Sequence, residues 1–387
     1  MISAFLVVIC GGLTTFDSGS DGSDGAFSPQ FSVVIDLADA ATASWDTQSP
    51  IAGNGVYDPQ KWAVVFKYTT IDIPPKVIVT FKNHPSGAPV IWLASGEVNI
   101  SGSVILDGND ASSISSPPAY AAPGPGGFSG GVRPTGSGTA SGGFGPGGGG
   151  TSSAGGFQSG PVTYGTANLV PLVGGSGGGG ATGNGGGGGG GGAILIASSD
   201  SISLSASGAI TANGGDGFGY GGSGGGIRLI ANIVQGLGQL RAVGGLGIAA
   251  GGVGYIRVDA DIVTLSDLGS PNWTTDFSPM PVFPAANAPT IEVTTIAGQP
   301  VPADPAATIY TTETILNTGL PVTVGIEARN VPASTTVSVR VVPARGSPFT
   351  VVSTPLVQQG GGVLTASATV TFPSGKSEMK LRANWAP

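Results

Sequence analysis

One short β-rich phrase recurs along the chain, and its repetition limits the folds that this sequence can adopt. The phrase reads Gly192-Ala-Ile-Leu-Ile-Ala197, then Ser201-Ile-Ser-Leu-Ser-Ala206, then Gly208-Ala-Ile-Thr-Ala-Asn-Gly-Gly215. Related copies begin at Pro89, Gly226 and Gly254. Apolar residues alternate with small or polar ones in each copy, which places one row of side chains inward and the next outward.

The breaks inside a copy are too short to hold a crossover helix. A repeat that cannot bury a face alone must stack on its neighbours. The repeats therefore predict an all-β protein built as a right-handed parallel β-helix, a solenoid in which each copy is one coil of three short strands. The alternative is an ordinary antiparallel sandwich in which the similarity of the copies is coincidental.

Glycine is concentrated in a few runs rather than spread evenly, although the chain has 71 glycines among its 387 residues. One interpretation is a disordered glycine linker. The other is a bundle of polyglycine-II helices, which pack closely because glycine has no side chain. The interspersed aromatic residues Phe128, Phe144, Phe157 and Tyr164 favour the ordered bundle. The main runs are 123–131, 142–150, 174–180, 185–192, 214–226 and 244–254.

Shifts in composition divide the chain into five parts. A signal-like segment and acidic leader (1–28) precede a cap with the first coils (29–110), a glycine-rich insertion (111–191), later coils with a second cap (192–288) and a C-terminal domain (289–387). In the C-terminal domain glycine falls and Thr/Val alternation dominates, with turns between the strands. This pattern predicts an immunoglobulin-like β-sandwich.

The first residues resemble a secretion signal, since 1–13 are mostly apolar. Cys10 before Gly-Gly suggests the lipid-acceptor cysteine of a bacterial lipoprotein, and a short strand in the mature protein is the alternative. Asp17, Asp21 and Asp24 follow among small residues. They are candidates for calcium ligands, or they belong to a solvated flexible leader.

The charge balance argues against nucleic acid as a partner. The chain has 14 Lys and Arg against 22 Asp and Glu, a net charge of −8, and no basic cluster. No apolar run reaches the roughly 18–20 residues of a membrane-spanning helix. A single Cys excludes an intrachain disulfide, and the single His84 has no His or Cys nearby for a zinc or Ser–His site.

Charged residues on the repeats are the candidates for a reactive or ligand-binding face. A polysaccharide-cleaving site would need paired carboxylates, or a carboxylate with Arg or Lys, on adjacent coils. Arg228 and Arg257 occupy equivalent positions in successive copies, with Asp259 beside them, so they should stack on one face. Such a stack is either an anion site or a solvated ladder. Further candidates are Asp107, Asp110, Asp216 and Arg241.

The run from Lys61 to Asp107, the Gly-Gly-Ala-Ile-Leu-Ile-Ala phrasing and the C-terminal domain resemble glycine-rich β-helical surface proteins of bacteria. The glycine runs are also similar in composition to the polyglycine sandwiches of some phage adhesin tips. The resemblance implies an extracellular or cell-surface location and specifies no activity.

These observations favour a secreted or surface-attached structural or adhesive protein that is not an enzyme. Its partners would be extracellular glycans, the cell envelope or further copies of itself, and no cofactor is expected apart from calcium. Two alternatives remain open. One is a protein that binds or degrades polysaccharides, and the other is the subunit of an extracellular filament.

Overall fold

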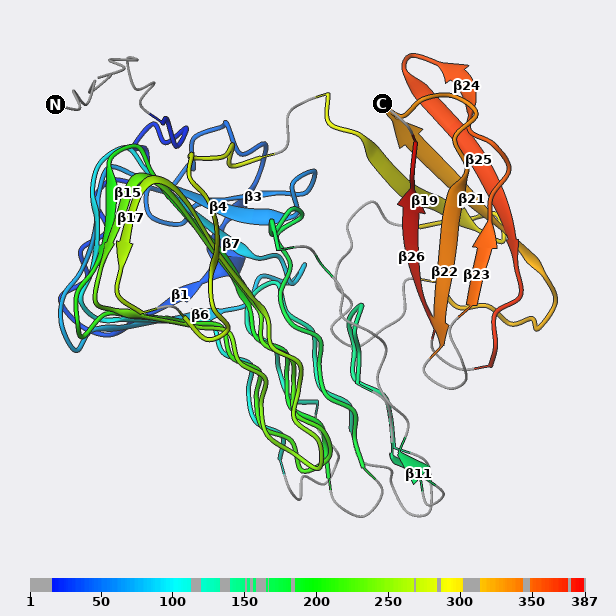
Figure 1. The fold of residues 1–387 in the computed structure, drawn as a ribbon, viewed down its shortest axis with the longest axis horizontal. Helices are drawn as coiled ribbons and strands as arrows, with labels where there is room; N and C mark the ends of the chain where they lie inside the picture. The colour runs from blue at the N-terminus through cyan, green and yellow to red at the C-terminus, as the bar shows by residue number, and fades with distance from the viewer. Residues whose placement is uncertain are drawn as a thin grey trace, which may run out of the picture.

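The computed structural model consists mainly of β-strands, and in the part of the chain that it describes the one helical element is the 3-10 turn η1 (Leu37–Asp39). It describes residues 16–112, 120–132, 140–149, 152–153, 156–157, 165, 167–181, 185–267, 269–283, 287–301, 314–343, 349–374 and 377–385. Figure 1 shows a body of stacked parallel strands, a glycine-rich layer that projects from it, and a separate antiparallel body near the C-terminus.

The repeated phrases align side by side as parallel strands in a common register. The ladder joins Val64 to Val90, Val90 to Ile194, Ile194 to Ile227 and Ile227 to Ile256. Equivalent residues of successive copies therefore lie side by side on neighbouring strands. The strands of this ladder are β4 (Ala63–Tyr68), β7 (Val90–Ala94), β12 (Ala193–Ser198), β15 (Gly226–Gly236) and β17 (Tyr255–Leu265).

Two further rows of parallel strands complete what we call the parallel domain (residues 16–283). The second row joins β5 (Ile71–Ile73), β8 (Val98–Ile100) and β13 (Ser201–Leu204) to the second half of β15. The third is a sheet of five strands in the order β1 (Val33–Asp36), β6 (Ile78–Lys82), β9 (Ser103–Ile105), β14 (Ala209–Thr211) and β16 (Gln239–Arg241).

The predicted fold class, a right-handed parallel β-helix with an immunoglobulin-like β-sandwich, is wrong. The chain instead forms a closed six-stranded parallel β-barrel together with parallel and antiparallel sheets. The prediction required three separate strands in every copy. The structure has uninterrupted strands of 11 residues at β15 and β17, and β12 and β13 pair with two different parts of β15. The first two rows thus belong to one 11-stranded sheet.

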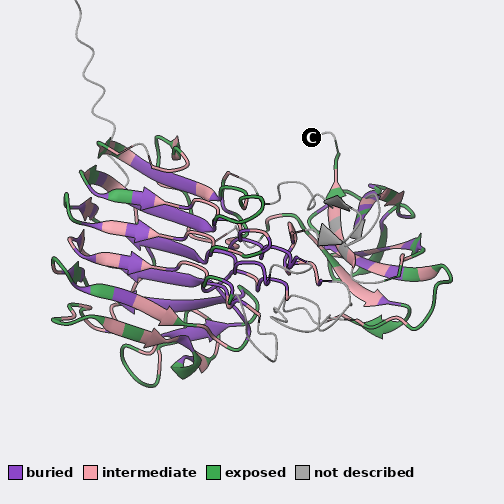
Figure 2. Cartoon of the chain, turned by 90° about the horizontal axis from the view of Figure 1, so that it is seen from below, coloured by how far each residue is buried: buried purple, intermediate pink, exposed green. Residues whose placement is uncertain are grey.

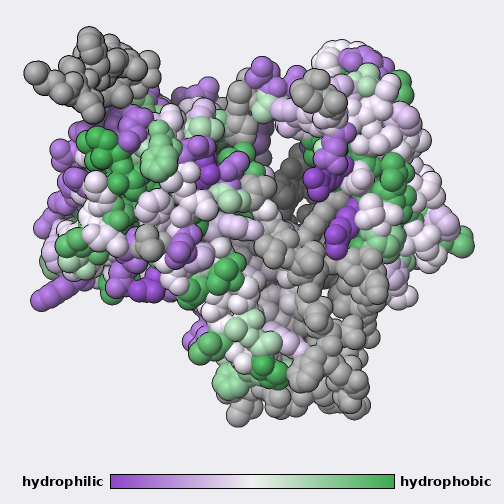
Figure 3. Space-filling view, viewed as in Figure 1, coloured by the Kyte–Doolittle hydropathy of each residue, from purple (hydrophilic) through white to green (hydrophobic). Residues whose placement is uncertain are grey.

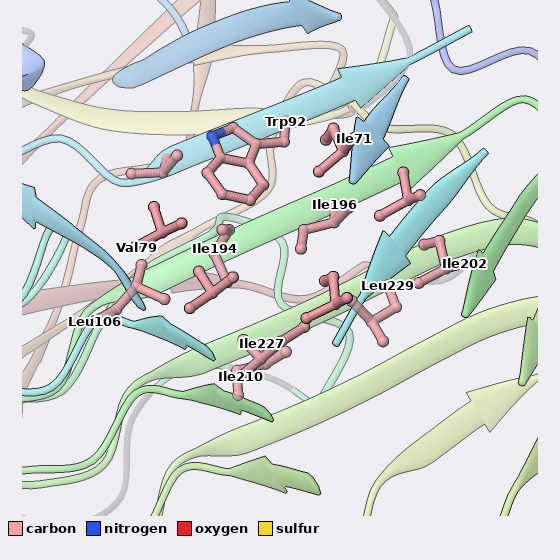
Figure 4. Close-up of a cluster of buried hydrophobic side chains, with 14 of the residues drawn as sticks. Ile71, Val79, Trp92, Leu106, Ile194, Ile196, Ile202, Ile210, Ile227 and Leu229 are labelled. Atoms are coloured by element: carbon pink, nitrogen blue, oxygen red, sulfur yellow. The ribbon is translucent and has the colours of Figure 1, made fainter. Parts of the chain in front are cut away.

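The inward side chains of the three rows form one apolar core. Figure 4 shows Trp92, Ile194, Ile196 and Ile227 stacked between strands, and each of them is fully buried. Burial of one such side chain contributes roughly 1.5–3 kcal/mol. The core therefore depends on keeping the register, since a shift by one residue would turn this row outward.

The first row is buried on both faces. Side chains that point away from the main core are also buried, namely those of Ala63, Val65, Leu195 and Ile230. They pack against apolar residues of other segments: Phe16, Trp45, Leu172, Val282 and Phe283. Burial on both faces explains why this phrase is continuously apolar, as in other buried parallel strands. Figure 2 shows these strands buried along most of their length, with exposed residues at their ends.

Short strands cover the ends of the stack. At the start of the chain, β3 (Val56–Asp58) pairs antiparallel with β4 and parallel with β2 (Ala41–Thr42). At the other end, β18 (Thr274–Asp276) pairs with the first half of β17. These short strands cover part of the edge strands, and at the far end β18 pairs with only residues 257–259 of β17.

The glycine-rich segments pack side by side as a layer that we call the glycine layer, formed by 106–112, 120–132, 140–149, 174–181, 185–192, 212–225 and 242–254. Its centre is the run Gly185–Gly192. The N–H groups of this run reach three neighbours in turn, with a period of three residues: Gly187 and Gly190 donate to 120–132, Gly188 and Gly191 to 212–225, and Gly189 and Gly192 to 106–112. A three-residue period is that of a polyproline-II helix.

Close backbone approach in this layer leaves no room for side chains. A Cβ on Gly188 would overlap the carbonyl oxygen of Gly215, and a Cβ on Gly190 would overlap that of Gly175. Real structures essentially never show such approaches. Glycine is therefore required here by packing. The short strands β10 (Ser152–Ser153) and β11 (Gly156–Phe157) pair near the same layer.

The C-terminal part has two antiparallel sheets that share one core. Inward residues of both sheets meet there, including Val324, Val339 and Ala366. One sheet has five strands, β20 (Gln299–Pro300), β19 (Thr290–Ile296), β21 (Val322–Arg329), β25 (Val363–Val370) and β24 (Val357–Gly360). The other has three, β23 (Phe349–Val352), β22 (Val337–Pro343) and β26 (Ser377–Ala383).

The central glycine run should not tolerate even a methyl group. We expect Gly190→Ala to lower the free energy of unfolding by about 1–3 kcal/mol, the usual cost of overpacking. The control is Gly319→Ala, where nothing lies within 4 Å of the new Cβ. Chemical denaturation of the full chain measures both, and equal stability of the two variants would contradict the packing argument.

Candidate binding surfaces

The far end of the glycine layer carries exposed apolar side chains. Phe218 is 49% exposed, Leu246 is 67% exposed and Ile248 is 42% exposed. We call these three residues the tip patch. Figure 3 shows apolar residues gathered where the glycine layer ends, below the parallel domain. Clusters of large exposed apolar side chains often mark interaction sites.

Backbone hydrogen bonds hold the two loops of the tip patch together. The N–H of Gly217 donates to the carbonyl of Leu246 at 2.8 Å, and the N–H of Ile248 donates to that of Gly219 at 2.7 Å. The Asp216 carboxylate also accepts the N–H of Leu246 at 2.6 Å. The patch therefore sits on a fixed backbone, and little conformational freedom remains to be lost on binding.

The two segments that carry the tip patch contain almost no charge. Segments 212–225 and 242–254 contain no Lys, Arg or Glu, and Asp216 is their one charged residue. Its carboxylate is already hydrogen bonded to the Leu246 N–H. Covering this region would therefore desolvate few charged groups, which is favourable for an apolar contact.

The carboxylates that were candidates for catalysis accept hydrogen bonds from backbone N–H groups of the glycine layer. Asp110 accepts the N–H of Asp216 at 2.7 Å, and Asp107 accepts the N–H of Asn213 at 2.7 Å. Asn213 in turn accepts the N–H of Val243 at 3.0 Å. These side chains form a ladder that links successive glycine segments, and each link satisfies a backbone group.

Arg228, Arg257 and Asp259, the predicted ligand face, do lie together. Asp259 is fully buried and sits between the two arginines, with its Oδ2 3.1 Å from Nη2 of Arg228 and its Oδ1 2.8 Å from Nε of Arg257. The side chains of Arg228 and Arg257 are only 3% and 7% exposed. Burial lowers the pKa of Arg228, and the charge of Asp259 opposes that shift.

Two distant segments close over this ion network. Arg257 donates to Asn168 at 2.9 Å and pairs with Asp276 at 2.9 Å, while Arg228 donates to the carbonyl of Pro281. The network thus fastens the segments around Asn168 and 276–281 to the outer side of the first row. In this arrangement the two arginines are enclosed by protein and do not present an open anion site.

The acidic leader is ordered where the structure describes it. The N–H of Phe16 donates to Asn232, the hydroxyl of Ser18 donates to the carbonyl of Ala94 at 2.8 Å, and that of Ser20 donates to the carbonyl of Tyr68 at 2.7 Å. The leader therefore runs across the ends of β4 and β7 and the middle of β15. Residues 16–20 are thus held against the parallel domain by hydrogen bonds.

Asp17, Asp21 and Asp24 have separate tasks in the leader. Asp17 accepts the N–H of Gly19, and Asp24 accepts the N–H groups of Gly53 and Lys67. Asp21 pairs with Lys67 at 3.2 Å. Among the described residues, no group of three or more acidic, His or Cys side chains could hold a metal ion.

The pKa of Asp21 reflects these contacts. Partial burial raises it, but hydrogen bonds from Ser23 and Lys67 and the charge of Lys67 outweigh burial and lower the pKa from 3.8 to about 2. The Lys67 side chain is 3% exposed, whereas that of Asp21 is 38% exposed. Solvent therefore screens part of the pair.

Cys10 lies outside the described residues. His84 stacks on Tyr57 in a turn, with its Nδ1 2.7 Å from the hydroxyl of Ser86. In the described part of the chain, no helix has the length and apolar character needed to cross a membrane. The tip patch was not predicted, although Gly-Phe-Gly at 217–219 and Gly-Leu-Gly-Ile at 245–248 could have suggested it.

No family of known proteins matches this chain, and no curated protein or solved structure is significantly similar to it. The functional argument therefore depends on the geometry of these surfaces.

Removing the central carboxylate of the ion network should destabilise the fold strongly. Asp259→Asn leaves two buried arginines without their shared counter-charge, and breaking a buried pair costs about 3–5 kcal/mol. The matched control is Glu327→Gln, which removes a carboxylate from the more exposed pair with Arg329 and should cost less than about 1 kcal/mol. Urea denaturation measures both, and a stable Asp259→Asn protein would contradict a structural role.

The leader should make stability depend on acid pH. Because the pKa of Asp21 in the folded protein lies below its ordinary value of 3.8, its contribution is complete above about pH 4 and is lost as the pH falls toward about 2. Asp21→Asn should therefore be less stable than the wild type near neutral pH, with a difference that shrinks toward about pH 2. Melting temperatures at several pH values test this. A constant difference would show that Asp21 acts through something other than its charge.

Proposed function

We propose that this chain is a non-catalytic adhesive protein of the cell surface or the extracellular space, which attaches through the tip patch. The observation that carries the proposal is the combination of a backbone-linked glycine layer with Phe218, Leu246 and Ile248 exposed at its end. Its partner is an apolar area on a second surface.

The hydrogen-bonded glycine layer can hold apolar side chains exposed, because its backbone cannot fold back to bury them. Hydrogen bonds between neighbouring segments satisfy the backbone N–H and C=O groups. The segments approach so closely that no side chain can enter between them. Because the three side chains are 42–67% exposed, covering each of them would contribute part of the roughly 1.5–3 kcal/mol that full burial gives. That gain is realised only when a partner covers the patch.

A non-catalytic role agrees with how the candidate acids and bases are used. The carboxylates of Asp107, Asp110 and Asp216 accept backbone N–H groups, and Asp259 is enclosed by two arginines. The resemblance to glycine-rich bacterial surface proteins also supports an extracellular role. The filament hypothesis stays a prediction.

Substitutions at the tip patch should abolish attachment without unfolding the protein. Beads coated with the full chain are tested on polystyrene, on clean glass and on the cells that produce the protein. We expect Phe218→Ser combined with Leu246→Ser to lower attachment to polystyrene and to the cells by more than about tenfold, since about 3 kcal/mol of burial is lost.

The matched control is Leu237→Ser, an equally exposed leucine (61%) outside the glycine layer. It should attach like the wild type. Melting temperatures should stay unchanged in all variants, because the substituted side chains are exposed. Full attachment of the double variant, or equal loss in Leu237→Ser, would overturn the proposed role of the tip patch.

A further inference from the structure

A column of polar side chains crosses the outer face of the second strand row. Asp72 lies beside Asn99, Asn99 beside Ser203, Ser203 beside Gln235, and Gln235 beside Thr264. The five residues occupy the same register position on β5, β8, β13, β15 and β17. We call them the polar column.

The polar column faces outward from the parallel domain. Its chain neighbours Val98, Ile202 and Val234 are fully buried in the core, so residues one position later lie on the opposite face. Asp72, Gln235 and Thr264 are exposed, and Asn99 and Ser203 are half-buried. Adjacent strands in a sheet are about 4.8 Å apart, so the column presents one polar group at each such step.

The chemistry of the column suits a ligand rich in hydroxyl groups. Amide and hydroxyl side chains both donate and accept hydrogen bonds. Gln235 already donates to Ser203 at 3.1 Å, which shows that neighbouring groups can share one hydrogen-bond chain. The centre of the column, from Asn99 to Thr264, has no charged member.

The negative charge near the polar column disfavours anionic ligands. Asp72 ends the column, exposed Glu97 lies two residues before Asn99, and the whole chain has a net charge of −8. An anionic polymer would be repelled by these groups, whereas a neutral one would not. Nucleic acids and acidic glycans are therefore disfavoured on this face.

We propose that the polar column binds a neutral linear polysaccharide that runs across the strands, with one sugar residue near each step of the column. This site is separate from the tip patch, since the column belongs to the second strand row and the patch to the end of the glycine layer. The protein would thus hold a glycan with one surface and an apolar partner with another.

The test measures depletion of the full chain from solution by insoluble cellulose, chitin and starch, with polygalacturonate gel as the anionic comparison. We expect retention on at least one neutral polysaccharide. Gln235→Ala combined with Thr264→Ala should weaken that retention by about tenfold or more, because two ligand hydrogen bonds are lost. Both side chains are exposed, so the fold should be unaffected, and a melting curve checks this.

Two control variants separate this site from other causes. Gln239→Ala removes an exposed amide from β16, on the other sheet, and should leave retention unchanged. Phe218→Ser with Leu246→Ser should also leave it unchanged, which distinguishes this site from the tip patch. The proposal is overturned if no neutral polysaccharide retains the protein, if the double variant at 235 and 264 binds like the wild type, or if polygalacturonate retains the protein equally well.

Discussion

The close approach of one polypeptide backbone to another governs this molecule. In the run Gly185–Gly192, N–H groups point to three neighbouring segments in turn, and the carbonyls that they meet leave no space for a Cβ. In the parallel domain, backbone hydrogen bonds join neighbouring strands in the same way and set their register. Position along the phrase thus decides both which residues enter the core and where the glycine segments leave it.

Much of the secondary structure could be read from the sequence, because period-two alternation is a local signal. The strands near Ala193, Ser201 and Ala209 lie where the phrase placed them. Their assembly could not be read in the same way. The break Ser198-Ser-Asp200 has no counterpart at Ala231-Asn232, so the later copies continue through the corner as single long strands. Whether a corner interrupts a strand depends on packing that one copy does not reveal.

The candidate sites, too, were predictable only where the repeat determines which residues meet. Equivalent positions in two copies were enough to bring Arg228 and Arg257 together, since parallel register is a regular property. Asn168, Asp276 and Pro281 close over them from segments without any repeat, and no spacing rule could have supplied them. The tip patch was missed for a different reason, because single apolar residues between glycines carry no periodic signal.

The leader has a consequence for how the chain matures. The backbone of Phe16 is held by Asn232, which is 216 positions later in the sequence, and Ser18 is held by Ser199, 181 positions later. Residues 16–18 can therefore reach their final place only after most of the parallel domain has been synthesised. Contacts over such separations are typical of slow folding. The first described residues to leave the ribosome thus wait for the chain as far as Asn232 before all of their contacts can form.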